Sequence, residues 1–252
     1  FFLDFADAAD LGDDESGNGN DFAETGIAAL NQSTDSPTNN FATLNPLLPS
    51  QGGFTPAAVI YAEGNLKFTT KGSTNSYSRS VSTILLSKGK WFAEIKATIV
   101  GYESLVGISG SNPTAASQYL GAGTYEVGYN QVNGSYYAGG SGSSYGATWA
   151  TGDIIGVALD LDSGTNTLTY YKNGASQGAI NITAVASTDL GGYVIGCCGW
   201  SDSSDSTFQA NFGNPSFSIS SGNADGDGYG NFEYAVPSGF FSICTKNLAE
   251  YG

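Results

Sequence analysis

Carboxylates are the side chains of this sequence with the clearest capacity for chemistry, because the chain contains no His. The absence of His excludes a Ser-His-Asp or Cys-His nucleophile and a His-ligated zinc site. Two carboxylates could still cleave a glycan, and Asp160 and Asp162 lie two residues apart, while Asp153 follows Gly152. These acids flank predicted turns, where Asp commonly caps backbone N–H groups. We therefore predict structural roles for them and no catalytic residues.

A second group of acids has the alternating spacing of a calcium loop. Asn223, Asp225 and Asp227 are separated by Ala and Gly, and calcium is held by several carboxylate and carbonyl oxygens around a sharp turn. The bidentate Glu that closes an EF-hand is missing from its place. An acidic surface turn is the alternative, here and for the acidic cluster between Asp10 and Asp21. Apart from calcium at such a loop, we expect no cofactor.

Aromatic side chains suggest a binding surface. The segment from Tyr125 to Thr148 places tyrosines among Asn, Gly and Ser, and it has too much Gly for a core strand, so we expect a long loop. This composition provides rigid amphipathic contact area with adaptable hydrogen bonding, and aromatic faces also suit sugar rings. The candidate ligand-binding residues are Tyr129, Asn130, Asn133, Tyr136, Tyr137, Tyr145, Trp149 and Trp200. The alternative is that the loop packs against a neighbouring subunit. Trp91 lies in a segment that alternates apolar and polar residues, so we predict that it is a core residue.

Charge and composition exclude several classes of function. The chain has 252 residues, of which 23 are acidic and 8 basic, giving a formal charge of −15. Such a chain cannot neutralise a run of phosphates, so we expect no nucleic-acid partner. It would also be repelled by anionic membranes, and no segment has the apolar length of a membrane helix. The 36 Gly and 29 Phe or Tyr residues favour an all-β protein of one or two domains.

The three cysteines, Cys197, Cys198 and Cys244, are predicted to be buried thiols, since free Cys is among the most buried residue types. Adjacent cysteines in a strand point to opposite faces, so a bridge from Cys244 to one of them is the alternative. The sequence has no Met and opens on Phe-Phe-Leu-Asp-Phe. We interpret it as a piece of a longer polypeptide.

Short alternating or apolar runs separated by turn residues predict the strands. The expected strands lie at 1–5, at 57–70 as two strands around Glu63–Asn65, and at 91–99, 105–109, 154–161, 167–172, 193–198 and 207–212. Asn173-Gly174 predicts a hairpin turn. The tail 238–245 is expected to pair with an early strand, and no helix is expected.

Five blocks occur in an order that resembles the SPRY (B30.2-like) domain. They are Gly89–Ile95, Val106–Ile108, Gly152–Asp160, Leu168–Gly174 and Asn211–Gly213. The resemblance implies a concanavalin-like, two-sheet antiparallel β-sandwich of jelly-roll type that binds partners through its loops and is not an enzyme. We expect 1–70 as a lead-in that packs on the sandwich, 71–220 as the SPRY-like sandwich, and 221–252 as a closing loop and strands.

The flanking blocks are similar to SPRY-containing proteins of tailed, often marine, bacteriophages. They are Leu3–Phe5, Ser16–Phe22, Asp35–Pro46, Pro237–Phe240 and Cys244–Leu248. This resemblance implies a virion component, in an extracellular particle, that contacts other virion proteins and copies of itself. We expect a tail-fibre or receptor-binding module that recognises host surface glycan or protein. The alternatives are a capsid decoration or fibre-shaft module and, third, a polysaccharide depolymerase.

Overall fold

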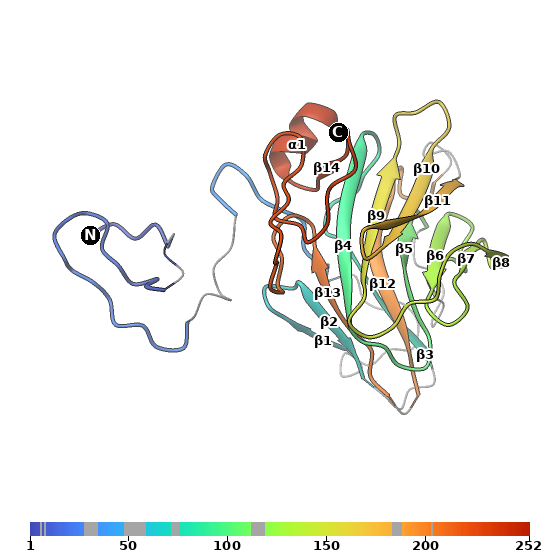
Figure 1. Cartoon of the computed structure of the whole chain (residues 1–252), viewed down its shortest axis with the longest axis horizontal. Helices are drawn as coiled ribbons and strands as arrows, with labels where there is room; N and C mark the ends of the chain where they lie inside the picture. The colour runs from blue at the N-terminus through green and yellow to red at the C-terminus, as the bar shows by residue number, and fades with distance from the viewer. Residues whose placement is uncertain are drawn as a thin grey trace.

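The computed structural model describes residues 1–5, 7, 9–27, 35–47, 59–71, 76–111, 119–182, 188–202 and 204–252. Two β-sheets pack face to face (Figure 1), and every strand pair but one is antiparallel. The predicted all-β, two-sheet sandwich is therefore confirmed.

The larger sheet has eight strands among the described residues. Their order is β1-β2-β13-β4-β9-β10-β11, and β14 pairs with β4 in parallel. The bounds are β1 Val59–Ala62, β2 Lys67–Thr70, β4 Lys90–Ile99, β9 Ile154–Asp160, β10 Thr167–Lys172, β11 Ala175–Asn181, β13 Thr207–Asn211 and β14 Phe241–Ser242. The predicted pair of strands around Glu63–Asn65 is confirmed for 59–70; residues 57 and 58 lie outside the described residues.

The second sheet has six strands, in the order β3-β12-β5-β6-β7-β8. The bounds are β3 Ser76–Val81, β5 Ser104–Ser109, β6 Glu126–Asn130, β7 Ser135–Ala138, β8 Ser141–Ser144 and β12 Val194–Ser201. β8 forms the free end of this sheet, at the right of Figure 1.

The main core lies between the two sheets. Trp91 and Ile95 of β4 belong to the same buried cluster as Val106 and Ile108 of β5. Side chains alternate along a strand, so these positions are the inward face of each sheet. The prediction that Trp91 is a core residue is confirmed, since its side chain has no exposed area.

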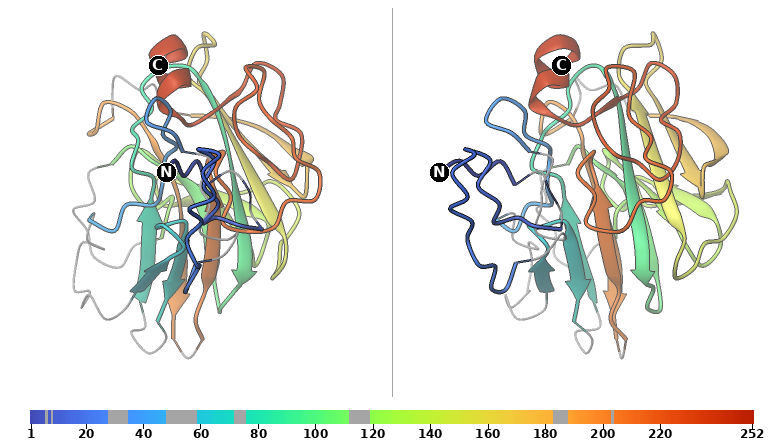
Figure 2. Two further views of the ribbon diagram at one scale, coloured as in Figure 1. Left: turned by 90° about the vertical axis from the view of Figure 1, so that its left-hand side faces the viewer. Right: turned by 60° about the vertical axis from the view of Figure 1, so that its left-hand side comes forward.

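The closing segment binds the sandwich as predicted, but it also contains a helix that the sequence did not reveal. Cys244 forms a β-bridge with Phe41, so the tail pairs with an early segment. It then continues into α1 (Thr245–Tyr251), which lies at one end of the sandwich in both views of Figure 2. The ring of Tyr251 stacks on Phe241 at a centroid distance of 3.8 Å. This packing stabilises a helix too short to be stable alone.

The predicted strand at 1–5 is wrong. Residues 1–5 form no strand, and Phe5 has a φ of 57°, outside the extended region. The described residues between 1 and 27 instead form an irregular segment that stands apart from the sheets in Figure 1. The buried Asp14 carboxylate organises it by accepting hydrogen bonds from the backbone N–H groups of Phe2, Ser16 and Asn20. Local Asx chemistry, rather than strand pairing, determines this conformation.

Candidate functional site

The segment predicted to be a long Tyr-rich loop is a three-stranded part of the smaller sheet. β6, β7 and β8 account for most of its residues, and a two-residue Gly139-Gly140 turn joins the last two strands. Both glycines have positive φ, 55° and 81°, as this tight hairpin requires. The expectation that the segment is excluded from the core is wrong, because Val127 and Tyr129 of β6 belong to the main buried cluster.

Three of the candidate ligand-binding residues are buried in this region. Tyr129, Asn130 and Trp149 have at most 2% of their side-chain surface exposed. The Tyr129 ring stacks on Tyr170 of the opposite sheet at 5.1 Å and meets Tyr145 edge-on at 5.5 Å. Burial raises the pKa of Tyr129 to about 12. These side chains join the two sheets and offer no contact surface to a ligand in this structure.

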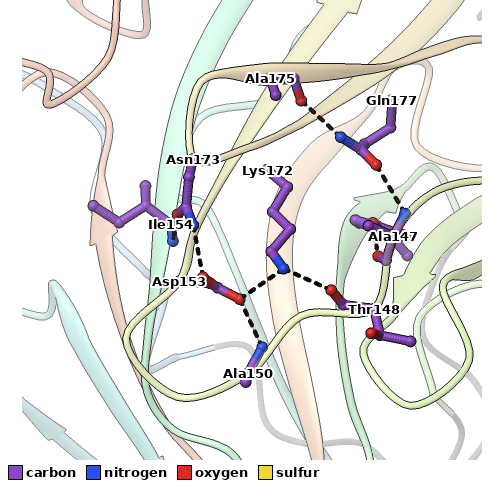
Figure 3. Close-up of polar contacts among 10 residues, drawn as sticks. Ala147, Thr148, Ala150, Asp153, Ile154, Lys172, Asn173, Ala175 and Gln177 are labelled. Atoms are coloured by element: carbon purple, nitrogen blue, oxygen red, sulfur yellow. Dashed lines mark hydrogen bonds and ion pairs between the residues drawn. The ribbon is translucent and has the colours of Figure 1, made fainter.

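A polar network anchors the connection that carries Trp149. Figure 3 shows Lys172 pointing to the Asp153 carboxylate, 3.3 Å away, and donating a 2.8 Å hydrogen bond to the Thr148 carbonyl. Burial opposes ionisation of Asp153, but hydrogen bonds from Asn173 and Ala150 and the Lys172 ammonium outweigh it and lower its pKa. The predicted structural role of Asp153 is confirmed.

The outer face of the smaller sheet carries a continuous row of aromatic rings, which we call the aromatic face. Trp200 meets Tyr77 edge-on at 5.0 Å, Tyr77 meets Tyr119 at 5.5 Å, and Tyr119 meets Tyr137 at 5.3 Å. All four side chains are half-buried. Edge-to-face contacts at these distances stabilise rings against one another and keep them rigid. The row crosses the sheet from β3 to β7.

The strand register explains why these rings face outward. In β12, Cys197 belongs to the main core, whereas Cys198 belongs to a separate cluster with Leu105 and Leu120. Trp200 is two residues beyond Cys198 and therefore shares its face. The Leu120 N–H donates to the Cys198 Sγ at 3.3 Å, which holds the Tyr119–Leu120 turn over the sheet. The predicted opposite orientation of the two cysteines is confirmed.

All three cysteines are free and buried, so the predicted buried thiols are confirmed and the alternative Cys244 bridge is wrong. Burial raises the pKa of the Cys197 thiol, and it raises that of Cys198 to about 12. Neither thiol is therefore prepared to act as a nucleophile.

Glu103 fixes the polar side of the aromatic face. Its carboxylate accepts hydrogen bonds from the Tyr77 hydroxyl and from the Asn130 side-chain amide. Burial and the neighbouring Glu103 carboxylate raise the pKa of Tyr77 well above its usual range. Burial, Tyr137 and Glu103 also raise the pKa of Tyr119. Both phenols are therefore neutral at physiological pH, and a neutral phenol can donate a hydrogen bond.

The sequence prediction found part of this surface. Trp200 and Tyr137 lie in it, and the Asn133 amide donates to the Tyr137 hydroxyl at 3.2 Å. Tyr136 points to the other side of the sheet, where it packs against Tyr145 at 5.6 Å. Tyr77 and Tyr119 were missed. The alternation of Ser with the larger residues Tyr77, Arg79 and Val81 was a usable signal for the strand that carries Tyr77.

The predicted acidic sites are occupied by the chain's own donors. Asp160 accepts hydrogen bonds from the N–H groups of Asp162 and Ser163, which confirms its predicted capping role. Asp225 accepts five hydrogen bonds, from the N–H groups of Asp227, Tyr229 and Ser242, the Ser242 hydroxyl and the Asn247 amide. A carboxylate has about four lone-pair positions, so the geometry gives Asp225 a structural role.

The other two residues of the calcium prediction are also engaged. The Asn223 amide donates to the Phe232 carbonyl, and Asp227 accepts from the Tyr251 hydroxyl at 2.9 Å. Within the described residues, no group of three or more His, Cys, Asp or Glu side chains is arranged to hold a metal ion. In the same part of the chain, no helix is long and apolar enough to cross a membrane.

One buried acid was not singled out by the sequence. Glu94 of β4 is fully buried and accepts hydrogen bonds from the Asn211 amide and from the N–H groups of Glu233 and Tyr234. Burial raises its pKa to about 6, although these hydrogen bonds act in the opposite direction. Glu94 thereby attaches the 223–234 segment to the outer face of the larger sheet.

The two sheets and their strand order define a β-sandwich, and the outer face of its smaller sheet is aromatic. Residues 100–215 match the family model described as the SPRY domain, which confirms the resemblance to that domain that the sequence blocks predicted. A crystal structure of a human SPRY domain has the same fold, with a TM-score of 0.50 and 18% identity, and the match covers 63% of this chain and 96% of that one.

Curated relatives are Ran-binding proteins. Ran-binding protein 9 of Xenopus tropicalis is 34% identical over 136 residues, covering 51% of this chain and 23% of the relative. Ran-binding protein 10 of Danio rerio is 32% identical over 136 residues, covering 51% and 21%. Human Ran-binding protein 9 is 33% identical over 114 residues, covering 44% and 14%. The chain thus matches less than a quarter of the length of these relatives.

Proposed function

We propose that this chain is a non-catalytic recognition module that binds its ligand across the aromatic face. The observation that carries the proposal is the row of four half-buried rings from Trp200 to Tyr137 on the outer face of the smaller sheet. A folded monomer gains little from leaving such rings in contact with water, and exposed aromatic patches commonly mark binding sites.

The chemistry of the aromatic face suits a neutral polar ligand with apolar surfaces. Rigid rings provide contact area at a low cost in conformational entropy. The neighbouring amide of Asn133 and the neutral phenol of Tyr119 supply hydrogen bonds, while the Tyr77 hydroxyl already donates to Glu103. Sugar rings and peptide backbones both present this combination, so a host surface glycan or protein is the proposed ligand class.

The engagement of the acids supports the non-catalytic part of the proposal. Asp153, Asp160 and Asp225 accept hydrogen bonds from backbone N–H groups, and Glu94 is fully buried. A glycosidase needs two carboxyl groups that flank the same bond and can reach the substrate. The names of the matched relatives likewise describe binding rather than catalysis.

The proposed biological setting is a phage virion, with the module in a tail fibre or receptor-binding protein. The flanking blocks carry this proposal, since they are similar to phage SPRY-containing proteins. The matched curated relatives are eukaryotic, and they align with about half of the chain. Ran is not the proposed ligand, because less than a quarter of each Ran-binding relative is matched. The alternative is a capsid decoration or fibre-shaft module in which this face contacts another virion protein.

The test is binding of the purified chain to a glycan array and to host envelope fractions, with and without protease treatment of the fractions. We expect the double variant Tyr137→Ala, Trp200→Ala to lose at least about ten-fold in affinity, since one ring contact is worth about 1 kcal/mol. The matched control is Tyr234→Ala, a half-buried tyrosine associated with Glu94 on the other sheet. Equal binding by the double variant and the control would overturn the choice of surface. Release of reducing ends from host polysaccharide would overturn the non-catalytic assignment.

A further inference from the structure

The free end of the smaller sheet is an unprotected strand edge. All four residues of β8, Ser141–Ser144, are exposed, and β8 pairs only with β7 among the described strands. Figure 1 shows it at the outermost position of the sheet. An edge strand presents N–H and C=O groups that can pair with another strand.

The hairpin register identifies which backbone groups point outward. Ala138 pairs with Ser141 across the two-residue turn, and Tyr136 pairs with Ser143. Residues that close a two-residue hairpin exchange hydrogen bonds with each other, and such pairs alternate with non-bonded ones along the ladder. The N–H and C=O groups of Gly142 and Ser144 therefore point away from β7.

Two other edges of the sandwich, β3 and β11, are partly protected. At the opposite end of the same sheet, a Leu44–Ser82 bridge and a 2.8 Å hydrogen bond from the Asn45 N–H to the Val81 carbonyl cover the C-terminal end of β3. In the larger sheet, β11 has a register irregularity opposite β10, with Gly178 at a φ of 103°. Bulges and covering segments are the usual means of preventing edge pairing. Within the described part of the chain, β8 has neither a bulge nor a covering segment, and it carries no charge or Pro.

We propose that β8 pairs antiparallel with β8 of a second copy of this chain, about a twofold axis through Ser143. In this register, Gly142 of each copy exchanges both backbone hydrogen bonds with Ser144 of the partner copy, giving four bonds in all. Ser143 meets Ser143 of the partner copy in the intervening non-bonded pair. The two smaller sheets then form one continuous sheet.

Charge distribution favours a second copy as the occupant. The chain carries a formal charge of −15, yet residues 127–152 contain no Asp, Glu, Lys or Arg. Two copies can therefore approach at this edge without placing like charges opposite each other, while their remaining charges are screened over about 8 Å at physiological salt. The small Ser and Gly side chains also permit close approach of the backbones. A basic or acidic peptide would find no complementary charge here.

The pairing predicts a specific disulfide. Opposed residues of a non-bonded antiparallel pair have Cα atoms about 4.5 Å apart, within the range that a disulfide spans. We expect Ser143→Cys to form a covalent dimer on mild oxidation at least about ten-fold faster than Ser176→Cys. Ser176 is an exposed serine of the β11 edge and serves as the matched control. The three native thiols are buried and give a low background.

A second variant tests the pairing without introducing a thiol. Ser144→Pro removes an outward N–H that β7 does not use, and therefore two of the four intermolecular bonds. We expect self-association, measured by sedimentation equilibrium, to weaken about 10- to 30-fold, with unchanged thermal unfolding as the check on folding. Equal oxidation rates for the two cysteine variants, or equal self-association of Ser144→Pro and wild type, would overturn the proposal. These outcomes are independent of ligand binding at the aromatic face.

Discussion

Replacing Asp225 with Ala should separate a structural role of this carboxylate from a calcium site. Asp225 is 8% exposed and accepts hydrogen bonds from Ser242 N–H at 2.8 Å, Ser242 Oγ at 2.7 Å and Asn247 Nδ2 at 2.8 Å. It also accepts bonds from the N–H groups of Asp227 and Tyr229 in its own loop. The variant therefore removes the hydrogen bonds by which Asp225 holds the 223–231 loop to β14 and α1.

The magnitude follows from which donors lose their partners. The Asn247 amide retains bonds to the Ser242 carbonyl and hydroxyl, so its loss is small. The Ser242 N–H is fully buried and left unsatisfied, which costs about 1–3 kcal/mol. The two loop N–H groups can be rehydrated and cost about 0.5–1 kcal/mol each. We expect Asp225→Ala to lower the free energy of unfolding by about 3 kcal/mol, or Tm by about 6–12 °C.

The assay is urea unfolding followed by tryptophan fluorescence, in EDTA and in millimolar CaCl₂. The control is Asp227→Ala, an exposed residue whose carboxylate accepts one hydrogen bond, from Tyr251, and it should change the free energy by less than about 0.5 kcal/mol. A calcium-dependent rise in wild-type stability that Asp225→Ala abolishes would refute the structural interpretation. A loss below about 1 kcal/mol in EDTA would refute the hydrogen-bond reasoning.

Two further predictions concern buried ionisable groups. Because the pKa of Glu94 is raised from 4.5 to about 6 in the folded state, its contribution to stability is full below pH 4.5 and is lost as the pH rises through 6. The expected loss is about 2 kcal/mol. It is measured as the difference in the free energy of urea unfolding between wild type and Glu94→Gln from pH 4 to 7. Parallel pH profiles of the two proteins would contradict the assignment. Burial keeps the thiols of Cys197, Cys198 and Cys244 from reacting. We expect a thiol reagent to modify none of them in the native protein and all three in guanidinium, and rapid native labelling would show that the thiols are accessible.

The sequence determined the sandwich because its information is local. Alternation in Trp91–Ile99, the apolar run at 154–161 and the Asn173-Gly174 turn each correspond to an observed strand or hairpin. Side-chain alternation and turn geometry depend on near neighbours only, so a pattern of a few residues is enough to predict them. The turn positions of Asp153 and Asp160 likewise predicted that these two carboxylates have structural roles.

The tertiary structure decided which side chains on the outer faces of the sheets stay exposed and which are covered by other segments. Glu94 alternates with apolar residues as a solvent-facing side chain would, yet it is fully buried because the 223–234 segment covers that face of β4. Tyr129 and Tyr137 come from the same Tyr-rich segment, but one fills the core and the other joins the aromatic face. Their separation depends on strand register and on contacts with Tyr119, Tyr170 and other residues distant in sequence. Composition carries no information on either, so only the folded chain could show which aromatic residues a ligand would meet.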